Sequence, residues 1–232
     1  MWEVYPFILK AYHLFREDKK QLESIFHALE IIAFRDKLVK TRADFASRLN
    51  EVLKNFTKVE DLENGLKAIC TEEKWYWRDD AVSDALDNIY IDNDTIIPYI
   101  LMRYENHLRA NNAKEKGYSF SLEDIKEITI EHIAPQTENG KRLASGYDKY
   151  DKEFYEECYL HCIGNLLLID KSHNSSLGNK PFKNKLASYE NTPLAQQREI
   201  KDFVKDDKWD KDAISARHEK IEKFVFETWS FA

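Results

Sequence analysis

Apolar residues recur at the spacing of an α-helix throughout the first half of this chain, and this periodicity constrains its fold more than any other feature. Such runs begin after Pro6 and continue near residues 22–33, 45–56 and 62–69. The spacing predicts successive amphipathic helices, the third of them with Thr41 as its N-cap. Only six glycines occur among the 232 residues. Good helix formers fill the chain instead, so a mainly α fold is expected.

A polar stretch at residues 111–117 interrupts the helical periodicity. Such a stretch between two patterned regions is typical of a linker. We therefore expect two domains: a helical domain over residues 1–112 and a second domain over residues 113–232.

The second domain has a different pattern, in which short strands flank a polar segment. Alternating residues over 128–133 predict one strand and the apolar run 165–169 predicts another. A helix or a pair of turns is expected over 174–189, and a long amphipathic helix over about 209–229. Strand, loop, strand and helix is the order of a ββα metal finger. The predicted fold class is mainly α with a small β element, a finger of this kind embedded in helices.

Four side chains of this region have the chemistry that phosphodiester hydrolysis needs. His132 ends the first predicted strand, and its ordinary pKa of about 6.5 suits a general base. Glu131 and Asn174 offer hard oxygen ligands, which suit Mg²⁺ or Mn²⁺. Asn165 opens the second strand. The alternatives are structural: a histidine satisfied in the core, a turn-forming Asn165, and an Asn174 that only caps a helix.

Three ordered blocks and a tail pattern carry a family resemblance. The blocks are Glu131–Gln136, Ile163–Leu168 and Asn174–Lys185, and the tail consists of Trp209, Ile214 and Arg217. Over roughly residues 94–230 the chain resembles the C-terminal domain of GmrSD-type, modification-dependent (type IV) restriction endonucleases, which carry an His-x-x-Pro motif. That domain belongs to the HNH (His-Me finger) nuclease superfamily, so the resemblance implies a metal-dependent HNH-type endonuclease.

The resemblance also implies a role for each matching position. His132 is the expected general base that activates water, and Asn165 braces the loop that carries it. Asn174 is an expected ligand of one Mg²⁺ or Mn²⁺, with His173 as a rival for that position. Glu131 stands where many HNH enzymes have a metal-binding Asp, and its longer side chain leaves direct and water-mediated contact open.

Lysines gather between residues 171 and 189, where the sequence has four lysines and no acid. We expect Lys180, Lys183 and Lys185 to contact DNA phosphates. A solvated lysine-rich face is the alternative.

Two other clusters have a structural and a functional interpretation. Trp75, Tyr76 and Trp77 could stack DNA bases, but packing in the core is favoured. Cys158 and Cys162 are four residues apart, without the paired spacing of a zinc knuckle. No structural zinc is therefore expected, and burial of these two thiols is favoured.

The sequence thus favours a DNA endonuclease domain of a bacterial restriction or phage-defence protein. The resemblance implies a sensor or nucleotide-hydrolysing domain or subunit that this chain lacks, since no Gly-x-x-x-x-Gly-Lys-Ser/Thr loop occurs. The DNA could be modified or unmodified. A non-catalytic DNA- or partner-binding module of the same lineage is the rival hypothesis, and a purely helical scaffold is a weaker one.

Composition informs the expected binding partners and cellular compartment of the protein rather than its chemistry. The net charge of −7 argues weakly against nucleic acid, although the local field at a site decides binding. No apolar window of about 18 residues occurs, so a transmembrane helix is not expected. Three cysteines without a framework spacing fit a reducing compartment, and a cytoplasmic location is expected.

Overall fold

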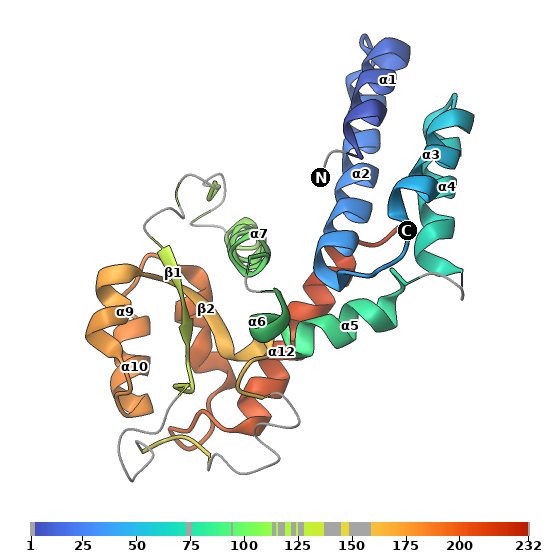
Figure 1. Ribbon diagram of the computed structural model, residues 1–232. Coiled ribbons are helices and arrows are strands. Elements are labelled where there is room, and N and C mark those ends of the chain that lie inside the picture. Colours follow the sequence, from blue (N-terminus) through green and yellow to red (C-terminus); the bar gives the residue numbers. More distant parts are fainter. Residues whose placement is uncertain are drawn as a thin grey trace. The chain divides into compact units, whose positions relative to one another are not determined.

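The computed structural model describes residues 3–72, 76–93, 95–112, 115, 119–121, 124, 128–136, 145–148 and 159–231. Within these ranges the chain is mainly helical and has one two-stranded sheet (Figure 1). The predicted fold class, mainly α with a small β element, is therefore confirmed. None of the described helices combines the length and the apolar character needed to cross a membrane.

The chain packs into two compact units. Unit 1 comprises residues 1–85 and 225–232, and unit 2 comprises residues 86–224. The packing thus divides the chain near residue 85, whereas the sequence suggested a linker at 111–117. The domain division at residue 112 stays a prediction.

Unit 1 is built from helices whose apolar faces meet in one core. They are α1 (Tyr5–Phe15), α2 (Lys19–Val39), α3 (Phe45–Asn55), α4 (Val59–Thr71) and the start of α5 (Asp79–Asp87). Helix α2 contacts α1 and α4, and α4 also contacts α3. The predicted cap of α3 was wrong. The Asp44 carboxylate accepts the Ser47 backbone N–H at 3.0 Å, whereas Thr41 Oγ1 accepts the Ala43 N–H in the preceding turn.

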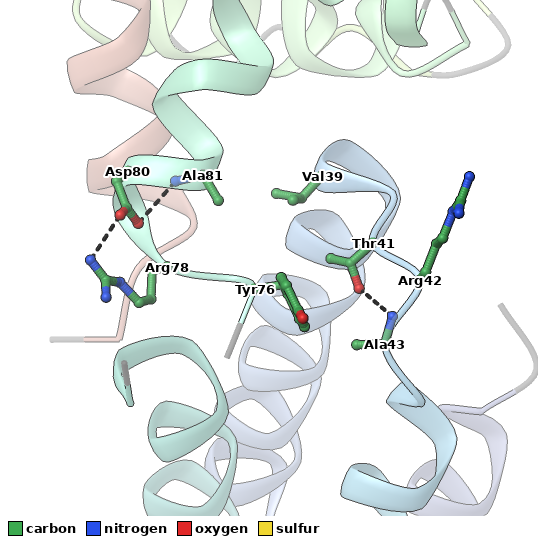
Figure 2. A pocket seen from close by; sticks show the side chains of 8 residues that line it. All are labelled: Val39, Thr41, Arg42, Ala43, Tyr76, Arg78, Asp80 and Ala81. Atoms are coloured by element: carbon green, nitrogen blue, oxygen red, sulfur yellow. Dashed lines mark hydrogen bonds and ion pairs between the residues drawn. The ribbon is translucent and has the colours of Figure 1, made fainter. Parts of the chain in front are cut away.

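The aromatic residues near position 76 differ in their surroundings. Trp77 is fully buried and its indole N–H donates to Asp36 at 3.2 Å, as the favoured core interpretation predicted. Tyr76 is 58% exposed. It lines a cavity of about 620 Å³ with Arg42 and Arg78, shown in Figure 2. Trp75 lies outside the described residues. None of the predicted site residues lines this cavity.

Unit 2 contains the sheet and the helices around it. Its elements are α6 (Ile89–Asn93), α7 (Ile97–Ala110), β1 (Ile128–His132), η1 (Ile163–Asn165), β2 (Leu166–Asp170), α9 (Lys171–Leu177), α10 (Phe182–Tyr189), α11 (Ala195–Arg198), η2 (Glu199–Phe203) and α12 (Lys211–Thr228). The last residues of α12, from Val225, belong to unit 1. The segment expected as a helix or a pair of turns forms two helices, α9 and α10.

The two strands are antiparallel, and His132 at the end of β1 pairs with Leu166 at the start of β2. Residues 166–169 are buried on both faces, as the apolar run predicted. On the outer edge of β2, side chains bond the backbone N–H and carbonyl of Leu168. Gln196 accepts the Leu168 N–H at 2.9 Å, and Gln197 donates to the Leu168 carbonyl at 2.7 Å. In Figure 1 the strands run between α9 and α10 on the left and α7 on the right.

Candidate functional site

The predicted site residues lie at one end of the sheet, where β1 ends and β2 begins. After His132 the chain turns away from the strand, and the Ile133 N–H donates to the Asn165 carbonyl at 3.0 Å. Residues Ile163–Asn165 form the single 3₁₀ turn η1 that leads into β2. The loop after the histidine and the turn before β2 are therefore fixed against each other.

The Asn165 side chain holds this junction together. Its Oδ1 accepts the Ala134 N–H at 2.8 Å and the Trp209 indole N–H at 3.0 Å. Its Nδ2 donates to the Ala134 carbonyl at 3.1 Å and the Leu160 carbonyl at 2.9 Å. The residue is completely buried, so each bond forms away from competing water. This is the contact pattern that bracing of the histidine loop requires.

Helix α12 explains why glycine precedes this asparagine. A Cβ added at Gly164 would lie 2.4 Å from the backbone oxygen of Ile214 on α12. No larger residue fits there unless the helix moves. On the same helix Arg217 is completely buried and donates to the carbonyls of Gly164 and Leu166, at 2.7 Å each. Thus Trp209, Ile214 and Arg217, the tail pattern of the sequence, all contact this junction.

His132 is buried against two partly exposed rings. Its side chain is 4% exposed. The Tyr90 ring of α6 meets it edge-on with centroids 4.3 Å apart, and the His161 ring lies 5.5 Å away. The side-chain nitrogen of Gln136 lies 3.0 Å from His132 Nδ1. His132 Nε2 is buried and has no hydrogen-bond partner among the described residues.

The surroundings of His132 keep its imidazole neutral. Burial lowers its pKa from 6.5 to about 3, and repulsion from His161 and Lys185 in their protonated forms acts in the same direction. Burial also lowers the pKa of His161. A neutral imidazole has one free lone pair and can accept a proton, which a protonated one cannot.

Glu131 points to the other face of the strand and has a different set of partners. Its Oε1 accepts from the Lys185 ammonium at 2.5 Å and from the Tyr189 hydroxyl at 3.4 Å, both on α10. Burial raises the pKa of Glu131 and lowers that of Lys185, and in both cases it opposes the attraction between the two charges. Because β1 stays regular up to His132, the contacts of Glu131 and His132 lie on opposite faces.

The expected phosphate contact of Lys185 is wrong for this structure. Lys185 is completely buried, and besides Glu131 its ammonium donates to the carbonyls of His132 and Ile133, at 3.0 and 3.1 Å. All three donor positions are occupied, so no proton is left for a DNA phosphate. Lys180 and Lys183 are exposed, as a phosphate contact requires.

Asn174 lies in the first half of α9 and reaches back to β1. Its Nδ2 donates to the Ile130 carbonyl at 3.2 Å, which leaves its Oδ1 to accept or to bind a cation. It is not the N-cap of α9, because Asp170 has that role. The rival His173 contacts the Ser188 hydroxyl with Nε2 at 2.5 Å.

The cysteines do not form a metal site in the part of the chain that the structure describes. Cys162 is a free, buried thiol in the core of unit 2, and Cys158 lies outside the described residues. Among the described residues, no group of three or more His, Cys, Asp and Glu side chains could hold a metal ion. Any divalent ion at this site would therefore need amide or water ligands as well.

Sequence reasoning missed three residues that contact His132. Tyr90 lies in a helical pattern with no distinguishing signal. His161 precedes Cys162, in a segment that was interpreted only with respect to zinc. Gln136 ends the first family block, directly after Pro135, and that position was the one available signal.

Comparison with known families identifies the family of this chain. Residues 77–224 match the sequence model of the family described as "GmrSD restriction endonucleases, C-terminal domain". The match covers more than half of the chain, and the chain belongs to this family. It is thus a restriction endonuclease domain, a class that acts on DNA. A search of curated proteins gave no match.

Proposed function

We propose that unit 2 hydrolyses phosphodiester bonds of DNA by an HNH-type mechanism in which His132 is the general base. The observation that carries the proposal is the position of His132. A buried, neutral imidazole with an unpartnered Nε2 sits at the end of β1, directly before the loop in which Asn165 holds Ala134 through two of its four hydrogen bonds. Such a group is costly to bury without a partner, and its lone pair suits the capture of a proton from water.

The HNH-type mechanism implies the following chemical step. As the oxygen of a water molecule bonds to phosphorus, His132 Nε2 takes a proton from it. The bond from phosphorus to the 3′ oxygen breaks, and the leaving oxygen takes a proton from a solvent water, which gives a 5′-phosphate and a 3′-hydroxyl. The pKa of about 3 makes His132 a weak base in the free protein. A DNA phosphate beside it raises that pKa, because a nearby negative charge favours the protonated imidazole.

The proposal includes one divalent ion, Mg²⁺ or Mn²⁺. The described residues offer two hard oxygen ligands for it, Asn174 Oδ1 and the Glu131 oxygen that the bond to Lys185 does not use. These ions often keep several waters and need only one or two protein carboxylates or amides, so Asn174 Oδ1 together with water ligands fits such an ion. Glu131, whose contacts lie on the strand face opposite to those of His132, would join it through a water ligand. When bound, the ion offsets negative charge on the phosphate and on the leaving oxygen.

DNA binding is assigned to the exposed lysines Lys180 and Lys183, which follow the β2–α9 segment. They would contact phosphates and so set position rather than sequence. Recognition of a modified base, if required, is proposed to depend on an N-terminal sensor domain or subunit. The proposed setting is the bacterial cytoplasm, in keeping with the free thiols of Cys70 and Cys162.

A second candidate function is a DNA- or partner-binding module without catalysis. One observation favours it: the ion pair between Lys185 and Glu131 offsets the charge of a proposed metal ligand. Weak metal binding would follow from that pairing.

The test is cleavage of supercoiled plasmid, modified and unmodified, by the purified chain with Mg²⁺ or Mn²⁺. His132→Ala is the test variant and His13→Ala, an exposed histidine of α1, is the matched control. We expect nicking or linearisation that needs the metal, survives in the control and is lost in His132→Ala. Cleavage that persists in His132→Ala would exclude His132 as the base.

If no variant cleaves DNA, thermal unfolding with Mn²⁺ separates the two candidate functions. A rise in Tm that disappears in Asn174→Ala supports an intact metal site. No rise in Tm favours the binding module.

A further inference from the structure

Two residues to which the family resemblance gives no role, Gln136 and Tyr90, contact the His132 ring. Gln136 lies four residues after His132, and Tyr90 comes from α6. The Gln136 amide nitrogen, as placed, lies 3.0 Å from His132 Nδ1 and 3.4 Å from the Tyr90 hydroxyl. One atom of one amide therefore contacts both neighbours.

This placement of the amide has a consequence for the base. If the Gln136 nitrogen donates to His132 Nδ1, that ring nitrogen is an acceptor and the ring proton sits on Nε2. Nε2 would then be a buried donor with no acceptor among the described residues. Orphaned buried N–H groups are rare because they lose a full hydrogen bond. A protonated Nε2 also has no lone pair with which to activate water.

If the oxygen and nitrogen of the Gln136 amide exchange places, Nε2 is neither a buried donor without an acceptor nor a nitrogen without a lone pair. The oxygen and nitrogen of a glutamine amide have nearly the same shape, and their assignment follows from the hydrogen bonds that each can make. After a half-turn of the amide, its oxygen lies next to His132 Nδ1 and the Tyr90 hydroxyl. It accepts from both, and the ring proton moves to Nδ1. Nε2 then carries the lone pair.

We propose that Gln136, anchored by the Tyr90 hydroxyl, holds His132 in the tautomer protonated on Nδ1 and so presents Nε2 as the base. Gln136 and Tyr90 are positioning residues that act through His132. The inference rests on the proposed function for its catalytic meaning, although the tautomer itself exists without DNA or metal. In the reaction Nε2 gains the proton from water, and the Gln136 oxygen keeps its bond to Nδ1–H of the imidazolium.

The ring of Tyr90 contributes a second restraint. It packs edge-on against His132 at 4.3 Å and lies flat against His161, with an interplanar angle of 12° and centroids 5.5 Å apart. The Tyr90 N–H also donates to the His161 carbonyl at 3.3 Å. Because this packing does not involve the hydroxyl, Tyr90→Phe removes the anchor of Gln136 and leaves the ring contacts.

The test is a long-range ¹H–¹⁵N correlation spectrum of the full chain with ¹⁵N-labelled histidine, recorded without metal and without DNA. His132→Asn assigns the His132 signals. In the unmodified chain we expect the Nδ1–H tautomer. Gln136→Met, which removes the acceptor, shifts the population toward Nε2–H. Gln136→Glu, which can only accept, retains Nδ1–H, and Tyr90→Phe gives an intermediate population.

A matched control comes from a second amide that contacts a histidine. Asn111 Nδ2 lies 3.2 Å from His107 Nε2 at an exposed position. Asn111→Leu alters the His107 signals and leaves those of His132 unchanged. The inference is overturned if His132 of the unmodified chain is protonated on Nε2, or if Gln136→Met leaves its tautomer as it was.

Cleavage measurements separate this inference from the proposed function. With an active chain, Gln136→Met lowers kcat by about 100-fold or more with little change in KM, since a positioned base contributes about 100- to 10,000-fold. Gln136→Glu retains most of the activity. A chain that shows the expected tautomers without cleaving DNA contradicts the proposed function alone. A Gln136→Met chain with full kcat contradicts the positioning role.

Discussion

The Asn165 side chain bonds both backbone groups of Ala134, accepting its N–H at 2.8 Å and donating to its carbonyl at 3.1 Å. An amide can make this pair of bonds because it carries an acceptor and a donor side by side. Ala134 lies two residues after His132. The backbone that carries the proposed base is therefore fixed by one side chain from the second family block.

Asn165→Asp should destabilise the protein while keeping the size of the side chain. It replaces the Nδ2 donor by an acceptor that faces the carbonyls of Ala134 and Leu160. Loss of two buried hydrogen bonds and the resulting repulsion should lower the free energy of unfolding by about 3 kcal/mol or more. Urea unfolding measures the change. Asn191→Asp, at an exposed position, should stay within about 0.5 kcal/mol of the unmodified chain.

Lys185→Met should destabilise the protein, because it leaves the buried Glu131 carboxylate without its partner. Removal of one partner from a buried ion pair costs about 3–5 kcal/mol. Mn²⁺ should restore part of this loss if Glu131 can bind a metal ion. Denaturant unfolding in EDTA and in Mn²⁺ tests both points. Lys183→Met, on the exposed face of the same helix, is the control. Equal stability of the two variants would contradict the buried pairing.

Lowering the pH should reduce the free energy of unfolding of the metal-free protein, because His132 is held neutral in the folded chain. Its pKa is about 3 in the folded chain and 6.5 as the reference value. Between these values the unfolded state binds the proton and the folded state does not, so stability falls as the pH is lowered from 6.5 toward 3. One such group gives a slope of up to about 1.4 kcal/mol per pH unit.

The measurement for this effect is urea unfolding in EDTA at pH 7 and pH 5. His132→Asn cannot titrate in this range, so it should lose less stability than the unmodified chain between these pH values. An unchanged pH dependence in His132→Asn would show that the imidazole is not held neutral by the fold.

Two lysines of the third family block, Lys180 and Lys183, should contribute to DNA binding. Lys180→Gln and Lys183→Gln should each weaken binding and reduce the slope of log K against log salt by about 0.9, the value for one phosphate contact. Fluorescence anisotropy with a short duplex at several salt concentrations measures both. Lys20→Gln, an exposed lysine of α2, should change neither. An unchanged slope in both test variants would assign DNA contact to another surface.

Much of the site could be predicted from the sequence. This holds only for features that a local pattern or a short motif of the chain carries. The strands around His132 and Asn165 showed in local patterns of alternation and apolar runs. The bracing role of Asn165 followed from the family block. These features are local or conveyed by a motif, so they do not require knowledge of packing.

Lys185 shows where sequence reasoning stopped. It lies in the same acid-free run as Lys180 and Lys183, and no local pattern separates the three. Only the packing of α10 against β1 buries Lys185 beside Glu131. Tyr90 was missed for the same reason, since its contact with His132 joins elements far apart in the chain. Long-range pairing of this kind leaves no trace in periodicity.

The hydrogen bond between the Trp209 indole and Asn165 also determines when the junction can fold during synthesis of the chain. Trp209 leaves the ribosome long after His132 and Asn165, and so does the part of α12 that carries Ile214 and Arg217. Until then Asn165 lacks one of its two donors, and the turn at Gly164 lacks the helix that packs on it. A nascent chain therefore cannot complete the junction early, and the His132 loop becomes fully braced only after this late segment has folded back.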